Sequence, residues 1–520
     1  MGENTNADPV TAAQQIAAGY ATEGLALELG TVLVDGAVDP TAKVRIPFAT
    51  LNRHGLVAGA TGTGKTKTLQ GLAGQLSDAG VPVLLADVKG DLSGMSRPGA
   101  DGPKIQSRAA DTGDDWTPTA YPCEFLSLGG SSSAVPIRAT LTQFGPILLS
   151  KVLGLNDTQE STLGLIFHWA DQNQLPLLDT KDLRSVIQHL TSDEGKADLK
   201  GIGGVSSATA GVILRALVNL EAQGGEDFFG EPEFEPADLI REVDGKGVVT
   251  LLELADQAAN PMLFSTFLMW LLAELYEDLP EAGDLDKPKL VFFFDEAHLL
   301  FADASKAFLQ RIEQTVKLIR SKGVGVFFCT QLPTDVPNAV LSQLGARIQH
   351  ALRAFTPEDQ KALSRTVKTY PVSKVYDLEE ALTSLGTGEA IVTVLSERGA
   401  PTPVAWARMR APRSLMDAIG EQAVTEAAKV SPLYAKYGET IDRESAYEKL
   451  TAKIAAPPAP EGAPADAPPP PPEAPRRRER EEPGMVAEVL GSPVVKSFLR
   501  SAASALGREI TRGLFGTKRR

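Results

Sequence analysis

The chain has 520 residues, a formal net charge of −15, and 43% hydrophobic against 22% charged residues. Its length allows two or three domains of ordinary size, each with its own core. The composition is that of a soluble globular protein. The acidic total excludes a molecule that is basic over its whole surface, although it is compatible with a local basic channel.

The cysteines and the N-terminus argue against several further classes of protein. Cys123 and Cys329 lie far apart and outside any C-x-x-C pair, so we expect neither a disulfide framework nor a structural zinc. The N-terminus is polar and lacks a signal-peptide pattern. Because the sequence also has no run of about 18 apolar residues, these features predict a cytoplasmic protein without a transmembrane span.

The first fifty residues lead into the first diagnostic motif. Residues 1–20 have a helical pattern, and residues 24–50 alternate in hydrophobicity, which predicts a small β-rich region. The apolar run 55–58 predicts a buried strand, and 67–80 has apolar residues at helical spacing. Between them, residues 59–66 read GATGTGKT and fit the P-loop pattern G-x-x-x-x-G-K-[ST] in its strand–turn–helix context.

The P-loop pattern has a direct chemical interpretation. Glycines let backbone N–H groups close around a β-phosphate at a helix N-terminus, where the helix dipole also favours an anion. Lys65 would reach the β- and γ-phosphates, and the Thr66 hydroxyl would take one Mg²⁺ position. We therefore expect ATP and Mg²⁺ as ligands, with the nucleotide held by Gly59, Ala60, Thr61, Gly62, Thr63, Gly64, Lys65, Thr66 and Lys67.

The run 81–87 is continuously apolar and ends in an aspartate, as a buried parallel strand does. Three charged residues, Asp87, Lys89 and Asp91, stand close together at its end. They are either groups at the nucleotide or subunit edge or solvated loop charges. Further strands are expected at 124–128 and 247–254.

The second diagnostic stretch, LVFFFDEAH at 290–298, is an apolar strand that ends in two carboxylates. Beside a P-loop this is the Walker B form. Asp295 would hold Mg²⁺ through water, and Glu296 would take a proton from the water that attacks the γ-phosphate. The strand predicted at 324–330 stops at Gln331, which is either a sensor of the γ-phosphate and the attacking water or a turn residue at a strand end.

The last part of the predicted sheet precedes a change in composition. A strand that carries Arg347 and Arg353 is expected at 346–355, followed by a helix that Thr356 caps. A hairpin at 388–395 and 404–408 would end the sheet.

The C-terminal part begins with a Pro/Ala-rich, semi-extended linker. After it, residues 485–520 carry seven Lys or Arg against two Glu, with apolar residues at helical spacing. This segment would contact nucleic acid, lie on a membrane surface or dock on a neighbouring subunit. Its apolar face favours docking.

The predicted fold class is α/β with a mainly parallel sheet. The chain is divided into an N-terminal helix and small β-rich region (1–50), a first part of the ATPase domain (51–142), a helical insertion (143–245), a second part of the ATPase domain (246–410), a helical segment (411–454), the Pro/Ala-rich linker (455–484) and a basic amphipathic helix (485–520).

Several long stretches resemble, in order, the bacterial HerA-like ATPases of the HerA–FtsK superfamily, and more narrowly the group named for a HerA-type C-terminal domain. The likeness covers about residues 20–410 and returns in the basic C-terminal helix. The stretches are GLVAGATGTGKTKTLQGLAGQLSDAGVPVLLADVKGDLSG, RATLTQFGPILLSKVLGLNDTQ, FFFDEAHLLF, FFCTQLPTDVP and TPEDQKAL.

The resemblance implies a RecA-like P-loop NTPase fold, assembly into a ring that is often hexameric, and ATP-driven movement along double-stranded DNA. It assigns the metal to Thr66 and Asp295, and catalysis to Lys65, Glu296, Gln331 and Arg320. Arg320 is the implied arginine finger, supplied across a subunit interface to stabilise transition-state charge. Arg347 and Arg353 are the alternatives.

The sequence also departs from HerA proper. Its N-terminal region is too short for a full HerA-type β-barrel, and it has no dense basic stripe with interleaved aromatics that would mark a DNA path. The first hypothesis is a Mg²⁺-dependent ATP hydrolase that acts as a DNA translocase or helicase. The alternatives are an oligomeric ATPase that acts on protein and a slow, nucleotide-gated scaffold.

Overall fold

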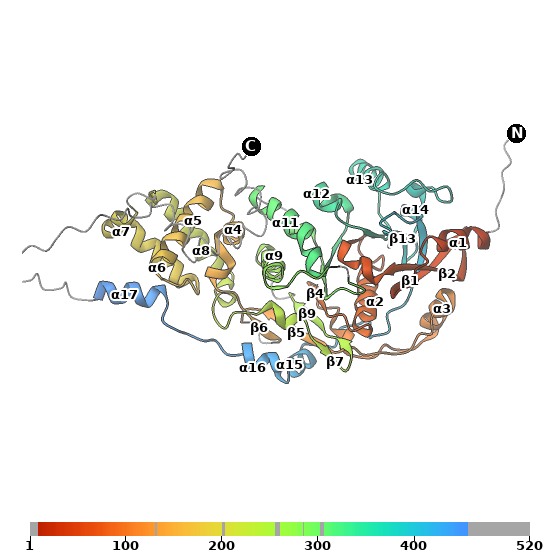
Figure 1. Cartoon of the computed structure of the whole chain (residues 1–520), viewed down its shortest axis with the longest axis horizontal. Coiled ribbons are helices and arrows are strands. Elements are labelled where there is room, and N and C mark those ends of the chain that lie inside the picture. The colour runs from red at the N-terminus through yellow and green to blue at the C-terminus, as the bar shows by residue number, and fades with distance from the viewer. Residues whose placement is uncertain are drawn as a thin grey trace, which may run out of the picture.

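The computed structural model of the chain describes residues 9–130, 133–199, 203–254, 261–283, 285–301 and 306–455. It shows a large sheet covered by helices, with a lobe of helices to one side (Figure 1). The predicted linker (455–484), beyond its first residue, and the predicted basic helix (485–520) lie outside the described residues. No helix of the described part is long and apolar enough to cross a membrane.

Twelve strands of the described chain form one sheet, in the order β2-β1-β14-β13-β12-β3-β11-β10-β4-β9-β5-β6. Neighbours run parallel from β12 to β6 and antiparallel from β2 to β12. The strands are β1 Ala26–Val34, β2 Ala37–Pro47, β3 Gly55–Ala58, β4 Val83–Asp87, β5 Cys123–Leu128, β6 Val135–Ile137, β9 Val249–Glu253, β10 Leu290–Phe294, β11 Val324–Thr330, β12 Ala346–Gln349, β13 Glu389–Thr393 and β14 Ala405–Met409, with a separate hairpin of β7 Glu242–Val243 and β8 Lys246–Gly247.

The central strands are continuously apolar because they are buried on both faces. In β10, Leu290, Phe292 and Phe294 pack into one core, whereas Val291 and Phe293 pack into another. The first core includes residues of α9 Pro261–Asp278, α11 Lys306–Ile319 and α12 Asn338–Leu341, and the second includes residues of α1 Pro9–Ala18 and α2 Lys65–Asp78. The remaining helices around the sheet are α3 Pro103–Thr112, α10 His298–Phe301, α13 Pro357–Val367, α14 Leu378–Ser384, α15 Glu421–Lys429 and α16 Pro432–Tyr437.

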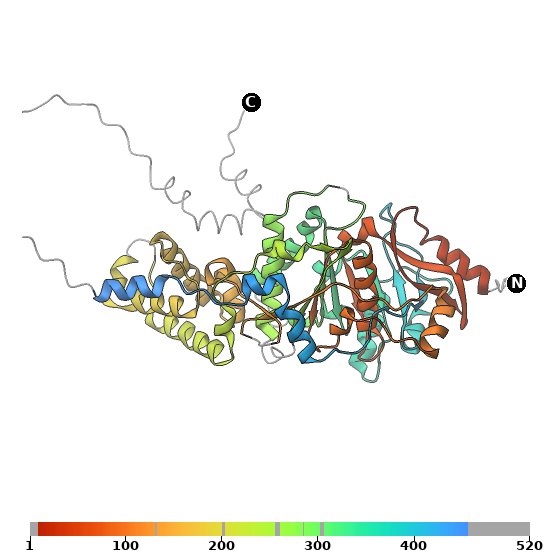
Figure 2. The same cartoon turned by 90° about the horizontal axis from the view of Figure 1, so that it is seen from below.

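The helical lobe is inserted between β6 and β9. It stands beside the sheet in both views (Figure 1, Figure 2). Its helices are α4 Leu141–Val152, α5 Asp157–Gln172, α6 Thr180–Thr191, α7 Asp193–Asp198 and α8 Ser207–Ala222, and α17 Ala446–Ala455 packs against it from the C-terminal side. Asn156 caps α5 and Asp179 caps α6 through reciprocal capping boxes. The Tyr447 amide of α17 donates to Asp182 Oδ1 at 2.8 Å, which fixes α17 on the lobe.

The structure confirms the strands at 55–58 and 324–330, the C-terminal hairpin, and the cap of α13 by Thr356. The predicted strand 346–355 is too long. It ends at Gln349, and the chain beyond it runs beside the P-loop, where Ala351 O accepts the Ala60 amide at 2.9 Å. The N-terminal β-rich region is also part of the main sheet, which β1 and β2 extend through β14.

Candidate active site

Three adjacent parallel strands bring the diagnostic motifs together. The P-loop follows β3, Asp295 and Glu296 follow β10, and β11 lies between these two strands and ends before Gln331. The end of β11 is bonded to both sides. The Gly59 amide donates to Thr330 O at 3.2 Å, and the Ala297 amide donates to Cys329 O at 2.8 Å. The carboxyl ends of the three strands therefore hold one site, as expected of a parallel sheet.

The P-loop leaves the start of α2 open to an anion. Gly64 is the N-cap of α2 and supplies no side-chain cap, so the first-turn N–H groups keep no such partner. Its φ of 115° favours glycine, and a Cβ there would lie 3.2 Å from Gly388. The Gly388 amide in turn donates to Thr63 O at 3.0 Å. The loop is thus held from behind by the start of β13.

Lys65 folds back onto its own loop. Its Nζ donates to Gly59 O at 2.6 Å and to Ala60 O at 3.2 Å. Burial lowers the pKa of Lys65, while the charges of Glu296 and Asp295 oppose this change. The amine therefore lies in a partly desolvated position between the loop and the acidic pair, where an added anion would be attracted to it.

Thr66 and Lys67, which were also predicted to hold the nucleotide, differ in their contacts. Thr66 lies in the first turn of α2 and is half-buried, and no hydrogen bond of its hydroxyl is found within the described part of the chain. Lys67, by contrast, donates to Met416 O. The structure thus leaves the Thr66 hydroxyl available to a ligand and directs Lys67 toward the segment that follows β14.

Asp295 and Glu296 are both half-buried at the end of β10. Burial, together with the charge of Glu296, raises the pKa of Asp295 to about 6. Glu296 has a left-handed φ of 48°, which is costly for a residue with a side chain and is typical of functional sites. Its Oε1 lies 3.4 Å from Lys89 Nζ, and its Oε2 lies 3.4 Å from His298 Nδ1. Oε2 is buried and has no hydrogen-bond partner among the described residues.

The three charged residues at the end of β4 and in the turn after it, Asp87, Lys89 and Asp91, have different surroundings. Asp87 is a structural group: its side chain is buried and accepts the amides of Lys89, Gly90, Asp91 and Leu92 at 2.8–3.3 Å. Lys89 reaches the active site through its ion pair with Glu296. Asp91 is half-buried and lies near Lys67. The charge pattern indicated this turn, but only the pairing of β4 with β10 shows which residue faces Glu296.

Sequence reasoning missed His350. Its ring is buried, with Nε2 3.0 Å from Thr68 Oγ1 and Nδ1 2.8 Å from Glu389 O. A Cβ on Gly59 would lie 2.6 Å from the Cβ of His350, so this side chain also supports the P-loop. Burial lowers its pKa to about 4, which keeps the ring neutral. The alternating strand pattern around His350 gives no indication that its ring contacts the P-loop helix.

The three candidate arginines lie in different places. Arg320 is exposed in the 3₁₀ turn that precedes β11, whereas the P-loop lies beyond the other end of that strand. Since β11 has seven residues, about 20 Å separates its two ends. Arg347 donates to Thr369 O and Leu341 O within the chain. Arg353 is exposed, and its Nη2 lies 3.4 Å from Thr61 O.

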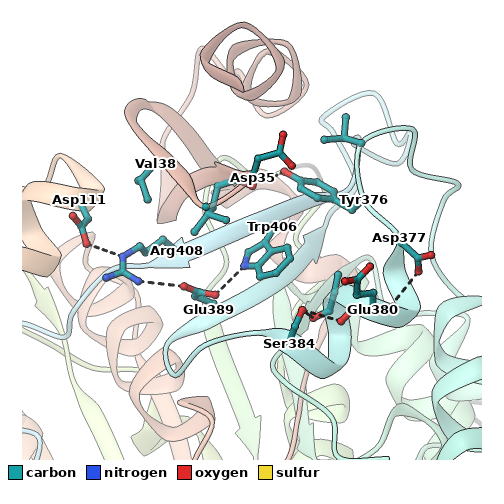
Figure 3. Close-up of a pocket in the computed structure, with 14 residues that line it drawn as sticks. Asp35, Val38, Asp111, Tyr376, Asp377, Glu380, Ser384, Glu389, Trp406 and Arg408 are labelled. Atoms are coloured by element: carbon teal, nitrogen blue, oxygen red, sulfur yellow. Dashed lines mark hydrogen bonds and ion pairs between the residues drawn. The ribbon is translucent and has the colours of Figure 1, made fainter. Parts of the chain in front are cut away.

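A cavity of about 700 Å³ lies outside this site, between the β1–β2 turn, α14 and β14 (Figure 3). Glu389 accepts from Trp406 Nε1 at 3.0 Å and from Arg408 at 3.2 Å, and Arg408 also pairs with Asp111 at 2.7 Å. The backbone carbonyl of Glu389 also accepts a hydrogen bond from His350, which supports the P-loop. Glu389 therefore connects the wall of this cavity to the P-loop.

The fold and the site define a RecA-like P-loop NTPase. The chain matches the helicase HerA-like C-terminal family over residues 34–520 and belongs to that family, which confirms the resemblance seen in the sequence. It is similar to the DNA double-strand break repair helicase HerA of Sulfurisphaera tokodaii, with 24% identity over 370 residues that cover 70% of this chain and 66% of that helicase. The match thus spans slightly less than two thirds of the relative.

Solved structures support the same fold. The bacterial conjugative coupling protein TrwB, in an unbound form, has a TM-score of 0.51 and 16% identity, covering 78% of this chain and 94% of that chain. TrwB in complex with the ATP analogue ADPNP has a TM-score of 0.52 and 15% identity with the same coverage. Another TrwB structure contains ADP and Mg²⁺.

Proposed function

We propose that the chain is a Mg²⁺-dependent ATP hydrolase that assembles into a hexameric ring and moves along or remodels double-stranded DNA. The observation that carries the proposal is the double attachment at the end of β11. Its last two residues hold Gly59 on one side and Ala297 on the other, so the phosphate loop and the acidic pair have a fixed relative position.

The residues present fit a nucleotide with its metal. The uncapped start of α2 suits a phosphate group, and Lys65 needs only to exchange two loop carbonyls for phosphate oxygens. Thr66 and Asp295 supply the hydroxyl and carboxylate oxygens that Mg²⁺ prefers. The nucleotide complexes of TrwB, and the one that also holds Mg²⁺, support this choice of ligands.

The same residues support hydrolysis. Glu296 is a carboxylate at the carboxyl end of β10, on the same edge of the sheet as the P-loop, which suits a group that accepts a proton from an attacking water. Gln331 is exposed and follows directly on β11, so it can orient that water. Bound Mg²⁺ would neutralise developing charge on the phosphates.

The position of Arg320 supports assembly. This side chain is at the opposite edge of the sheet from its own P-loop, so it can serve as a finger only for a neighbouring copy. Arg353 lies beside its own loop and is the alternative within one chain. The relationship to a DNA repair helicase favours DNA as the polymer. The net charge of −15 favours protein as the second candidate.

The test is ATP turnover by the purified full chain, with and without duplex DNA and with and without Mg²⁺. Turnover that needs Mg²⁺, rises several-fold with DNA and is lost in Lys65→Ala and Glu296→Gln supports a DNA motor. Turnover that is indifferent to DNA supports the protein-directed ATPase. An assembled wild-type sample without turnover contradicts both.

A further inference from the structure

The turn after β4, residues 88–91, lies beside the acidic pair. Strands β4 and β10 are parallel neighbours, with Leu85 opposite Phe293, so their carboxyl ends point to the same edge. The Asp87 carboxylate accepts four backbone amides of this turn and the residue after it, and thereby fixes its shape. The backbone at Lys89 is therefore firmly placed, while its side chain is 45% exposed and reaches Glu296 through its terminal amine.

In this conformation both oxygens of Glu296 are directed at protein groups. Oε1 is paired with Lys89 Nζ at 3.4 Å, and Oε2 is buried beside His298 Nδ1. The backbone of Glu296 is also pinned, since the next amide, that of Ala297, donates to Cys329 O. A general base must offer an oxygen within hydrogen-bond reach of the proton it accepts. The carboxylate therefore has to turn about its side-chain bonds before it can act.

We propose that Lys89 is a positioning residue that holds Glu296 in this resting conformation and must release it before hydrolysis. The inference rests on the proposed ATP hydrolase function and adds a restraint on its base. The ion pair occupies Oε1 and holds the carboxylate toward the turn after β4.

The groups around Lys89 explain why its amine pairs with Glu296 and how this ion pair can be broken. Partial burial lowers the pKa of Lys89, but Asp295 and Glu296 outweigh this and raise it, so the amine stays charged at neutral pH. A second anion near Asp295 and Lys65 would compete with Glu296 for the same amine. Because the lysine side chain is long and half-exposed, it can follow that anion at little cost.

The experiment compares ATP turnover without DNA in the full-length wild type and four variants. Lys89→Ala is expected to raise kcat about threefold or more while the KM for ATP changes less than about twofold. Lys89→Arg keeps the charge and is expected to keep the low rate. Lys104→Ala, an exposed lysine in α3, is the matched control and should behave as wild type. The double variant Lys89→Ala/Glu296→Gln should be inactive, because the gain depends on Glu296.

A Lys89→Ala rate at or below that of wild type overturns the inference, as does a gain that survives in the double variant. Melting temperatures of all variants verify that the turn stays folded. The wild-type measurement alone reports on the proposed function: an assembled wild type without turnover overturns that function and the inference together, whereas an active wild type with an unresponsive Lys89→Ala overturns the inference alone.

Discussion

The ring of His350 connects the P-loop helix to strand β13, with Nε2 3.0 Å from Thr68 Oγ1 in α2. Its other nitrogen, Nδ1, lies 2.8 Å from Glu389 O in β13. His54 makes a comparable pair of contacts at the other end of the central strands, to Val316 O at 2.6 Å and the Val326 amide at 3.1 Å. The two buried histidines thus form a natural pair of test and control.

His350→Ala should weaken nucleotide binding as well as stability. It removes two hydrogen bonds and leaves a cavity behind Gly59, which costs about 2–4 kcal/mol. His54→Ala should cost a similar amount of stability and leave the Kd for nucleotide unchanged, since it lies away from the loop. Thermal unfolding and titration with a fluorescent ATP analogue provide both readouts. Equal nucleotide affinity in the two variants would contradict a supporting role for His350.

His350 should also make stability depend on pH. Its folded-state pKa is lowered to about 4 from the ordinary 6.5, so the unfolded chain binds a proton first as the pH falls. This contribution to the free energy of unfolding is complete above pH 6.5 and is lost between about 6.5 and 4, by roughly 3 kcal/mol in total.

The measurement is the difference in unfolding free energy between wild type and His350→Gln across that pH range. Asp295 acts in the opposite direction, because its folded pKa is raised to about 6. The difference between the two proteins cancels that contribution. Parallel curves for the two proteins would show that His350 does not titrate as expected.

Lys65→Ala and Glu296→Gln should separate binding from chemistry. Without Lys65 the phosphates lose their cation, so the Kd for ATP should rise by about tenfold or more. Glu296→Gln keeps the size of the side chain but cannot accept a proton, so kcat should fall by at least about 10²-fold while ATP still binds. Equilibrium binding beside steady-state turnover measures both. Turnover that persists in Glu296→Gln would assign the base elsewhere.

Arg320→Ala should abolish turnover without abolishing nucleotide binding, with a loss in kcat of about 10³-fold. Arg347→Ala should act through stability instead, because its guanidinium bonds to carbonyls of its own chain. Mixing Arg320→Ala with Lys65→Ala subunits should restore part of the activity, since one variant keeps the loop and the other supplies the arginine. If mixing restores nothing and Arg353→Ala is the inactive variant, the finger acts within one chain.

The sequence predicted the parts of the site whose residues are contiguous. The P-loop, the acidic pair and the strand before Gln331 each lie within one short stretch, and local pattern sufficed to find them. His350 and the Lys89–Glu296 ion pair could not be found in this way, because they depend on which strands are neighbours: β12 beside β3, and β4 beside β10. The joining of β1 to β14, nearly 400 positions apart in the chain, depends in the same way on pairing across the fold.

Arg320 precedes β11 and Gln331 follows it, so one strand connects these two residues. The strand between them has seven residues, all buried, and is bonded to neighbours on both sides. Such a packed strand is stiff and shifts as one piece. In the proposed ring, a displacement of Gln331 would therefore be carried through β11 to Arg320, the side chain that the proposal places beside the neighbouring subunit.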